Sequence, residues 1–286
     1  MVRKILILVF SMFLWSCDSN DLVGFVASSS DDVDTRFRQS HEYTGDRPLK
    51  EIHTEAQYVF YVCSDVHVEN STDNLDNFVM SLRHDSVASF ALMLGDCVET
   101  KGAMSLFTSA LEFDPSFHEN DHPVFVTTGN HDTYFSQWND FMRLLGPSAY
   151  WFEVCHEEGK DLFIALDSAG AVFGKKQLNW LNNLLDSYRD GYRRCVVFTH
   201  TNVFASGTAN FLSGGYSVEE SLLFTELMDV YDVDVVFQGH FHQRQDIVYR
   251  DVRYTLVGSL ADREDNPEYL KVCVSSDGLD YEWVCL

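Results

Sequence analysis

Positive charge is scarce in this chain. Its 286 residues include 20 Lys and Arg against 44 Asp and Glu, so the formal net charge is −24. A surface of this sign repels the backbone of DNA and RNA, and we therefore expect no nucleic-acid polymer as a partner. An anionic small molecule meets the same repulsion unless bound cations give its site local positive charge.

An apolar run that could span a bilayer comfortably is also missing. The apolar stretch over residues 5–15 follows Arg3 and Lys4 and is short for a membrane helix. A small residue then directly precedes Cys17, which resembles a bacterial lipoprotein signal. We expect a signal peptide over residues 1–16, a lipid on Cys17 that anchors the protein to a membrane, and an exported, periplasmic or cell-surface location. The alternative is an ordinary signal peptide or short anchor without lipid.

Cysteine is present without a zinc-finger spacing. Of the seven cysteines, six remain if Cys17 carries lipid, and an even number in an exported protein permits disulfides. Three of the six, Cys63, Cys195 and Cys273, lie in apolar runs where cysteine is readily buried as a small hydrophobe. The sequence therefore leaves the pairing open.

Internal repeats and a second change of composition are absent, which indicates one folded domain. Residues 17–50 are rich in Ser, Asp and Asn and predict a flexible tether. The folded domain is expected over residues 51–286.

Short apolar runs alternate with longer amphipathic ones along this domain. We predict strands over residues 58–63, 90–94, 124–127, 163–166, 195–198 and 233–237, and helices over residues 75–87, 175–188 and 217–231. After residue 245 the pattern predicts further strands, with turns at residues 250–251 and 277–278. This order indicates an α/β fold in which two mixed sheets pack as a sandwich flanked by helices.

Polar residues of the metal-ligand type follow the predicted strands directly. They fall in five short blocks: Asp65-Val66-His67, Gly95-Asp96, Gly129-Asn130-His131-Asp132, Thr199-His200 and Gly239-His240-Phe241-His242. Residues two apart at a strand end lie on one face, so Asp65 and His67 can reach one ion, and the last block repeats that geometry. Nitrogen and oxygen ligands without thiolate suit Mn, Fe or Zn.

Taken together, the five blocks resemble the signature of the calcineurin-like metallophosphoesterases: D-x-H, G-D, G-N-H-[DE], H and G-H-x-H. The resemblance extends over residues 58–242, and residues 166–168 with Gln177 and the pair at 180–181 are similar to the secreted bacterial branch. It implies a first metal held by Asp65, His67, Asp96 and His242, and a second held by Asp96, Asn130, His200 and His240. It further implies that His131 lies beside the leaving group and that Asp132 hydrogen-bonds to His131.

The same resemblance implies a hydrolase with two divalent metal ions, which cleaves small-molecule phosphate esters by attack of a metal-bridging hydroxide. Monoester and diester substrates both remain open, as does the oligomeric state. The competing hypothesis is a non-catalytic, metal-containing binding or scaffold lipoprotein with the same fold, although no ligand position has been lost. Glu99 stands where the purple acid phosphatases have a tyrosine, so a tyrosinate-bound ferric centre is not expected.

Several nearby residues have a structural interpretation instead. Asp167 and Ser168 are expected to end a strand and turn, and Trp180 is expected in the core. For Asn202, Asn210 and Tyr216, contact with the substrate and an ordinary loop position are equally open.

Overall fold

The structure is a computed structural model that describes residues 32–111, 122–204 and 215–286. The predicted signal peptide, Cys17 and Asn210 lie outside these residues.

Two mixed sheets form the centre of the molecule. The first has the order β1-β5-β6-β7-β8-β10-β9, and the second has the order β12-β11-β2-β3-β4. The first contains β1 (Glu51–His53), β5 (Tyr150–His156), β6 (Gly159–Ala165), β7 (Arg194–Phe198), β8 (Val235–Gln238), β9 (Gln245–Tyr249) and β10 (Val252–Leu256). The second contains β2 (Tyr58–Cys63), β3 (Ala88–Met93), β4 (Val124–Val126), β11 (Glu268–Val274) and β12 (Leu279–Cys285).

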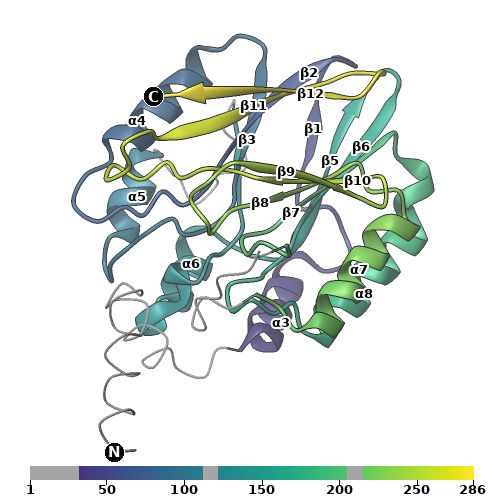
Figure 1. Ribbon diagram of the computed structural model, residues 1–286, viewed down its shortest axis with the longest axis horizontal. Helices are drawn as coiled ribbons and strands as arrows, with labels where there is room; N and C mark the ends of the chain where they lie inside the picture. The colour runs from purple at the N-terminus through teal and green to yellow at the C-terminus, as the bar shows by residue number, and fades with distance from the viewer. Residues whose placement is uncertain (1–31, 112–121, 205–214) are drawn as a thin grey trace, which may run out of the picture.

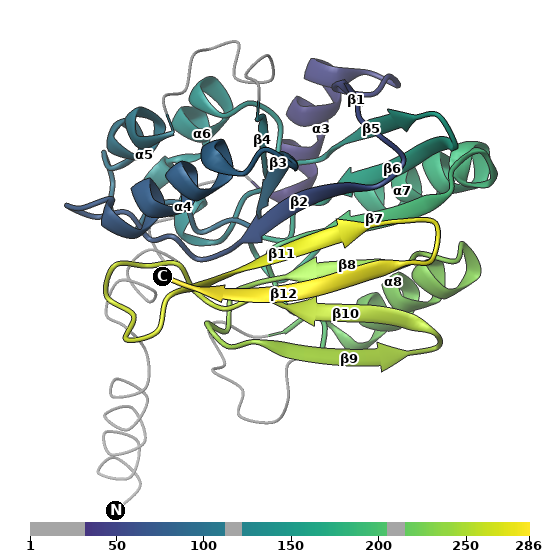
Figure 2. The same ribbon diagram turned by 90° about the horizontal axis from the view of Figure 1, so that it is seen from above.

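Helices cover the outer face of each sheet, so the molecule has four layers (Figures 1 and 2). One outer layer contains α4 (Asp73–His84), α5 (Met104–Ala110) and α6 (Trp138–Leu144), and the other contains α3 (Val33–Thr44), α7 (Lys175–Tyr188) and α8 (Val218–Val230). Two 3-10 turns, η2 (His131–Ser136) and η3 (Arg189–Gly191), complete the elements of the described residues. The predicted fold class, two mixed sheets in a sandwich flanked by helices, is confirmed.

Aromatic rings fill the space between the two sheets. Phe60 stacks on Phe90 with ring centroids 5.1 Å apart and meets Phe163 edge-on at 5.3 Å. Phe125 stacks on Phe152 across the same interface. These rings are fully buried, and each pair adds about 0.5–1.5 kcal/mol beyond the burial of its surface. The packed rings therefore hold the two sheets at a fixed distance and orientation.

The predicted tether is wrong for residues 33–44, because these residues form helix α3, which packs on the domain. Asp32 caps the helix by accepting a hydrogen bond from the N–H of Thr35. Phe37 contacts Trp180 of α7, and the Arg36 guanidinium pairs with the buried Asp167 carboxylate at 2.7 Å. The buried stripe of α3 includes the polar Arg36 and Ser40, so the hydrophobic pattern of this segment does not reveal the helix.

The six described cysteines are free thiols. Among the residues that the structure describes, no helix has both the length and the apolar character that crossing a bilayer requires.

Candidate metal centre

The predicted ligands meet at one edge of the sandwich. Strands β2, β3 and β4 run parallel in one sheet, and β7 and β8 run parallel in the other. Their carboxyl ends therefore lie at matching edges, where loops gather functional side chains. A hydrogen bond crosses between the sheets at this edge: the N–H of His240 donates to Asp65 Oδ2 at 2.8 Å.

A first cluster contains Asp65, His67 and His242. Asp65 Oδ1 lies 3.8 Å from His67 Nε2 and 3.5 Å from His242 Nε2. The two Nε2 atoms are 3.1 Å apart. Two ring nitrogens and a carboxylate oxygen therefore converge on one point inside the protein.

A second cluster contains Asp96, His200 and His240. Asp96 Oδ2 lies 3.3 Å from His200 Nε2, which in turn lies 3.2 Å from His240 Nδ1. The amide oxygen of Asn130 is 3.0 Å from the same His200 nitrogen. The donor atoms of all four side chains thus converge in a second group.

Asp96 joins the two clusters. Its Oδ2 atom is 3.7 Å from His67 Nε2 in the first cluster, besides its contact with His200 in the second. Its other oxygen, Oδ1, accepts a hydrogen bond from the N–H of His131 at 2.9 Å. The carboxylate is therefore fixed with one oxygen between the two groups of nitrogen donors.

The backbone is left-handed at five of the clustered residues. Positive φ values between 48° and 78° occur at Asp65, His67, Asp96, His240 and His242. Non-glycine residues seldom adopt this conformation, but Asp and His are enriched among those that do. Each side chain is thereby turned inward directly after its strand.

Two glycines allow the loops to approach one another. A Cβ at Gly129 would lie 2.1 Å from Asp96 Oδ1, and one at Gly239 would lie 1.8 Å from the hydroxyl of Ser64. Neither approach leaves room for a side chain.

Hydrogen bonds orient three of the four histidine rings from behind. His200 Nδ1 contacts the carbonyl oxygen of Leu94 at 2.8 Å, His67 Nδ1 contacts Glu99 Oε2 at 2.7 Å, and His242 Nδ1 contacts Glu264 Oε1 at 2.8 Å. Such contacts fix the ring orientation and direct Nε2 inward. Neither Glu99 nor Glu264 belongs to the predicted ligand blocks. Glu99 lies three residues after Asp96, so its position next to a ligand block could have indicated a role at the site. No local pattern distinguishes Glu264.

His131 lies beside the first cluster, and its ring centroid is 4.8 Å from that of His67. Its Nδ1 atom is 3.5 Å from Glu99 Oε2. The predicted hydrogen bond between Asp132 and His131 is wrong, because the Asp132 carboxylate accepts the backbone N–H groups of Cys97 and Gly129, each at 2.9 Å. Asp132 therefore holds the ligand loops together, and Glu99 is the carboxylate beside His131.

Electrostatics give this centre an affinity for positive charge. Burial disfavours the charged form of Asp65, but the nearby His242 and His67 rings hold its pKa well below the usual value. Burial likewise opposes protonation of His200, yet the nearby Asp96 charge raises the pKa of His200 to about 9. The pKa of His242 is raised to about 9 against the same burial cost by the Asp65 carboxylate, 3.5 Å away. The carboxylates therefore draw protons onto histidines where cations can bind instead.

The donor set fits divalent cations. Asp65 Oδ1 is buried and accepts no hydrogen bond from any described residue, although it points at the two histidine nitrogens of its cluster. A buried carboxylate oxygen without a partner is costly, and a coordinated cation would satisfy it. Imidazole and carboxylate ligands without thiolate suit Mn, Fe or Zn. The clusters are therefore candidate metal-binding sites.

Residues close to the ligand blocks in sequence support the loops around the centre. The Ser168 hydroxyl accepts the N–H groups of His200 and Thr201 at 3.1 and 2.8 Å. Tyr216 donates to the carbonyl oxygen of Thr201 and stacks on Phe173, so it packs inside the domain. Asn202 accepts the N–H of Phe204 within its own turn. Asp167 and Ser168 thus have the structural roles predicted, and Asn202 and Tyr216 have loop-supporting contacts.

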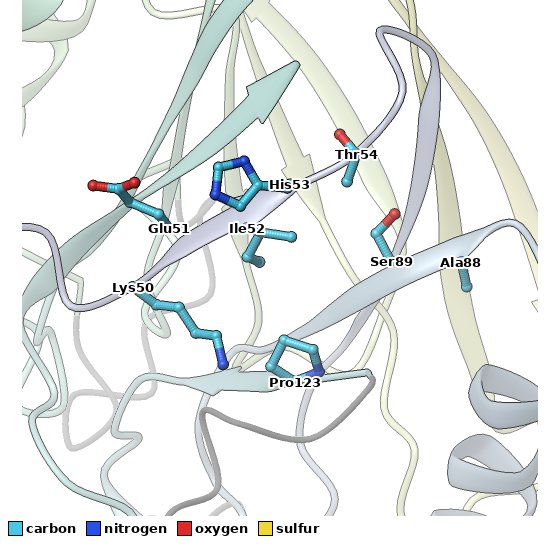
Figure 3. A pocket seen from close by; sticks show the side chains of 8 residues that line it. All are labelled: Lys50, Glu51, Ile52, His53, Thr54, Ala88, Ser89 and Pro123. Carbon is cyan, nitrogen blue, oxygen red and sulfur yellow. The ribbon is translucent and has the colours of Figure 1, made fainter.

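A separate cavity of about 330 Å³ lies beside β1 and the beginnings of β3 and β4. Its lining includes Ile52, Ser89 and Pro123 (Figure 3). Ser89 lies at the amino end of β3, whereas Asp96 follows the carboxyl end. None of the predicted ligands lines this cavity.

Removal of the carboxylate behind His242 should weaken metal binding. We expect Glu264→Ala to lower the affinity for one of the bound cations about 10–100-fold, because an unsupported imidazole is a poorer and less ordered ligand. Calorimetric titration of the metal-free protein with Mn²⁺ would measure the change. Asp265→Ala removes the exposed neighbouring carboxylate and is the matched control. Equal affinities for both variants would contradict the role of Glu264.

Comparison with known proteins identifies one family. The profile of the calcineurin-like phosphoesterase family matches residues 58–244, more than half of the chain. No curated protein sequence matches.

Solved structures with a similar fold include GAP50, the anchor in the inner membrane complex of Plasmodium, with a TM-score of 0.60 and 16% identity over 81% of this chain and 85% of that one. A purple acid phosphatase from yellow lupin seeds has a TM-score of 0.61 and 14% identity over 81% of this chain and 52% of the lupin chain. A phosphatase from Mycoplasma pneumoniae has a TM-score of 0.52 and 14% identity over 82% and 94%. Likeness at these identities concerns the fold alone, and the family is established by the match over residues 58–244. This chain belongs to the calcineurin-like phosphoesterase family.

Proposed function

We propose that this protein is a hydrolase that uses two divalent cations, Mn, Fe or Zn, to cleave small-molecule phosphate esters. The observation that carries the proposal is the position of Asp96 Oδ2, 3.7 Å from His67 Nε2 and 3.3 Å from His200 Nε2. One carboxylate oxygen between two groups of nitrogen donors is the arrangement that a bridging ligand requires. Asp65, His67 and His242 would complete one position, and Asn130, His200 and His240 the other.

Cations bound at these positions would supply the Lewis acidity that activates a water molecule and neutralises phosphoryl oxygens. Residues of the chain would supply the proton and hold the catalytic groups in position. His131, whose ring lies beside that of His67, would donate a proton or a hydrogen bond to the leaving oxygen as negative charge develops there. Glu99 lies within 3.5 Å of His131 Nδ1 and favours the orientation in which Nε2 faces the substrate. The Asp132 carboxylate keeps the loop that carries His131 in place.

The test of this proposal is hydrolysis by the full-length protein in detergent after loading with Mn²⁺, Fe²⁺ or Zn²⁺. We expect the loaded protein to cleave p-nitrophenyl phosphate, bis-p-nitrophenyl phosphate or both, and to lose activity after chelation. Bound metal without hydrolysis of either ester would overturn the enzymatic proposal in favour of a metal-containing scaffold.

We further propose that the protein is an exported lipoprotein of the secreted bacterial branch, anchored to a membrane through Cys17. Support comes from the basic start, the apolar segment over residues 5–15 and the small residue before Cys17. The membrane would then be a partner through the lipid, and the phosphate ester would be encountered outside the cytoplasm.

The anchor can be tested by substitution. We expect Cys17→Ser to move the protein from the membrane fraction to the soluble fraction, or to leave it uncleaved with residues 1–16 attached. Mass spectrometry of the unaltered protein should identify Cys17 as the lipid-bearing N-terminus. Cys285→Ser, which removes an exposed thiol far along the chain, is the control and should leave fractionation unchanged. Identical behaviour of both variants would contradict the lipid anchor.

A further inference from the structure

The loop between β10 and β11, residues 257–267, reaches the candidate metal centre from outside the five ligand blocks. The hydroxyl of Ser259 donates to the carbonyl oxygen of Asp65 at 2.9 Å. Asp262 accepts the backbone N–H groups of Asp73 and Asn74 at the start of α4. Glu264 contacts His242, as described above. The loop is thus fixed at both its flanks and at its centre, and the residue between Asp262 and Glu264 is held next to the site.

That residue, Arg263, places a positive charge next to Glu99, on the solvent-exposed side of the centre. Its Nη1 atom donates to Glu99 Oε2 at 3.1 Å. The same oxygen is 2.7 Å from His67 Nδ1 and 3.5 Å from His131 Nδ1. The Glu99 carboxylate therefore lies between the guanidinium and His131, the proposed donor to the leaving oxygen.

The Arg263 guanidinium also has N–H donors that no described residue uses. Arginine carries five N–H donors in a planar fork, and Glu99 is the only partner of this side chain among the described residues. The Arg263 side chain is 48% exposed, whereas that of Glu99 is 3% exposed. Its remaining donors are therefore open to solvent beside the candidate metal centre.

We propose that Arg263 binds the terminal oxygens of a phosphoryl group and makes the centre selective for phosphomonoesters over phosphodiesters. The inference rests on the proposed phosphoesterase function and names its substrate class. A monoester presents three terminal oxygens and a charge of about −1.5 to −2 near neutral pH, whereas a diester presents two such oxygens and one charge. A guanidinium fork matches the oxygens of a terminal phosphate in pairs. In a chain of net charge −24, a dianion gains most from that contact.

A purely structural role for Arg263 makes a different prediction. If Arg263 serves only to neutralise Glu99, its loss disturbs His67 and His131 and slows both kinds of ester equally. If it binds the terminal phosphate, its loss changes the ratio between the two esters. The ratio of kcat/KM values therefore separates the two roles.

The experiment compares full-length variants in detergent, loaded with Mn²⁺, on p-nitrophenyl phosphate and bis-p-nitrophenyl phosphate. We expect Arg263→Ala to lower kcat/KM for the monoester about 10–100-fold, the range for a lost hydrogen bond to a charged group. The diester value should fall less than about threefold, and Arg263→Lys should restore part of the monoester activity. The control is Arg250→Ala, since Arg250 is 46% exposed and pairs with Asp229 at 3.3 Å outside the centre.

Parallel loss on both esters, or no loss on either, would overturn the inference and leave the proposed function intact. If the unaltered protein cleaves neither ester, the proposed function fails, and binding of inorganic phosphate to the Mn²⁺-loaded protein decides the role of Arg263 by itself. A tenfold or greater weakening in Arg263→Ala by calorimetry, against unchanged binding in Arg250→Ala, supports the phosphate contact. Equal phosphate binding in both variants overturns it.

Discussion

Asp96→Asn should lose both metal and activity. We expect the metal content to fall from about two ions per chain to one or fewer, because an uncharged amide NH2 group would replace the Oδ2 atom that lies between the two positions, and this group cannot bridge two cations. Activity should fall at least about a thousandfold, since cation charge supplies several kcal/mol of transition-state stabilisation. The substitution is mild for the fold, because an amide oxygen can still accept the His131 N–H that Oδ1 accepts now. Metal analysis and kinetics on one preparation would measure both effects.

Asp186→Asn provides the matched control for this variant. This substitution makes the same chemical change at an exposed residue of α7, away from the ligand edge. Circular dichroism would verify that both variants keep the secondary structure of the unaltered protein. Full metal content and full activity in Asp96→Asn would refute the dinuclear centre.

Arg36→Met should have the largest effect on stability. Arg36 and Asp167 form a two-point contact, with Nε and Nη2 at 2.7 and 2.9 Å from the carboxylate oxygens, and both side chains are buried. Removing the cation leaves a buried carboxylate without its partner, which typically costs about 3–5 kcal/mol. For a chain of this size such a loss lowers the melting temperature by roughly 6–20 °C. Urea unfolding and thermal melting would measure the change.

The same helix contains the control for that measurement. Arg38 is 58% exposed and lies 3.9 Å from Glu42, so Arg38→Met should change the free energy of unfolding by less than about 1 kcal/mol. The double variant Arg36→Met with Asp167→Asn should regain part of the loss, because it removes the unpaired charge as well. If Arg36→Met and Arg38→Met were equally stable, α3 would not be an integral part of the domain.

Local sequence patterns predicted the regular parts of the fold well. Leu178, Leu181 and Leu185 recur at helical spacing, and α7 occupies the predicted range of residues 175–188. The turns at residues 250–251 and around 277–278 also lie between strands as expected. These elements owe their form to periodicity and turn residues, which a single segment contains in full.

Elements stabilised by distant contacts were missed. Strand β1 is three residues long, and Ile52 is its single buried residue, so its pairing with β5 has no local sequence pattern. Helix α3 depends on a charge pair with Asp167, 131 residues further along the chain. Short helices such as α5 contain too few turns for a periodicity to emerge.

In the candidate site too, the residues of local motifs were predicted, whereas those brought in by distant contacts were not. The ligand-type residues stand in short blocks at strand ends, so their convergence follows from parallel strands and could be anticipated. Their supporting partners come from elsewhere: Glu264 and Arg263 belong to a loop that only the folded sheet brings to the centre. The error over Asp132 arose because the resemblance implied a contact with His131, whereas the Asp132 carboxylate accepts backbone N–H groups of the ligand loops.

The left-handed backbone at the five clustered residues lowers the stability of the fold while it positions the proposed ligands. Each such conformation at a non-glycine residue costs about 1–3 kcal/mol, and glycine would adopt it freely. Replacing Asp65 or His242 with glycine would therefore relieve backbone strain while removing a proposed ligand. Variants selected for heat resistance alone should accumulate changes at these positions and lose the metal centre, whereas selection for turnover would preserve residues that make the fold less stable than it could be.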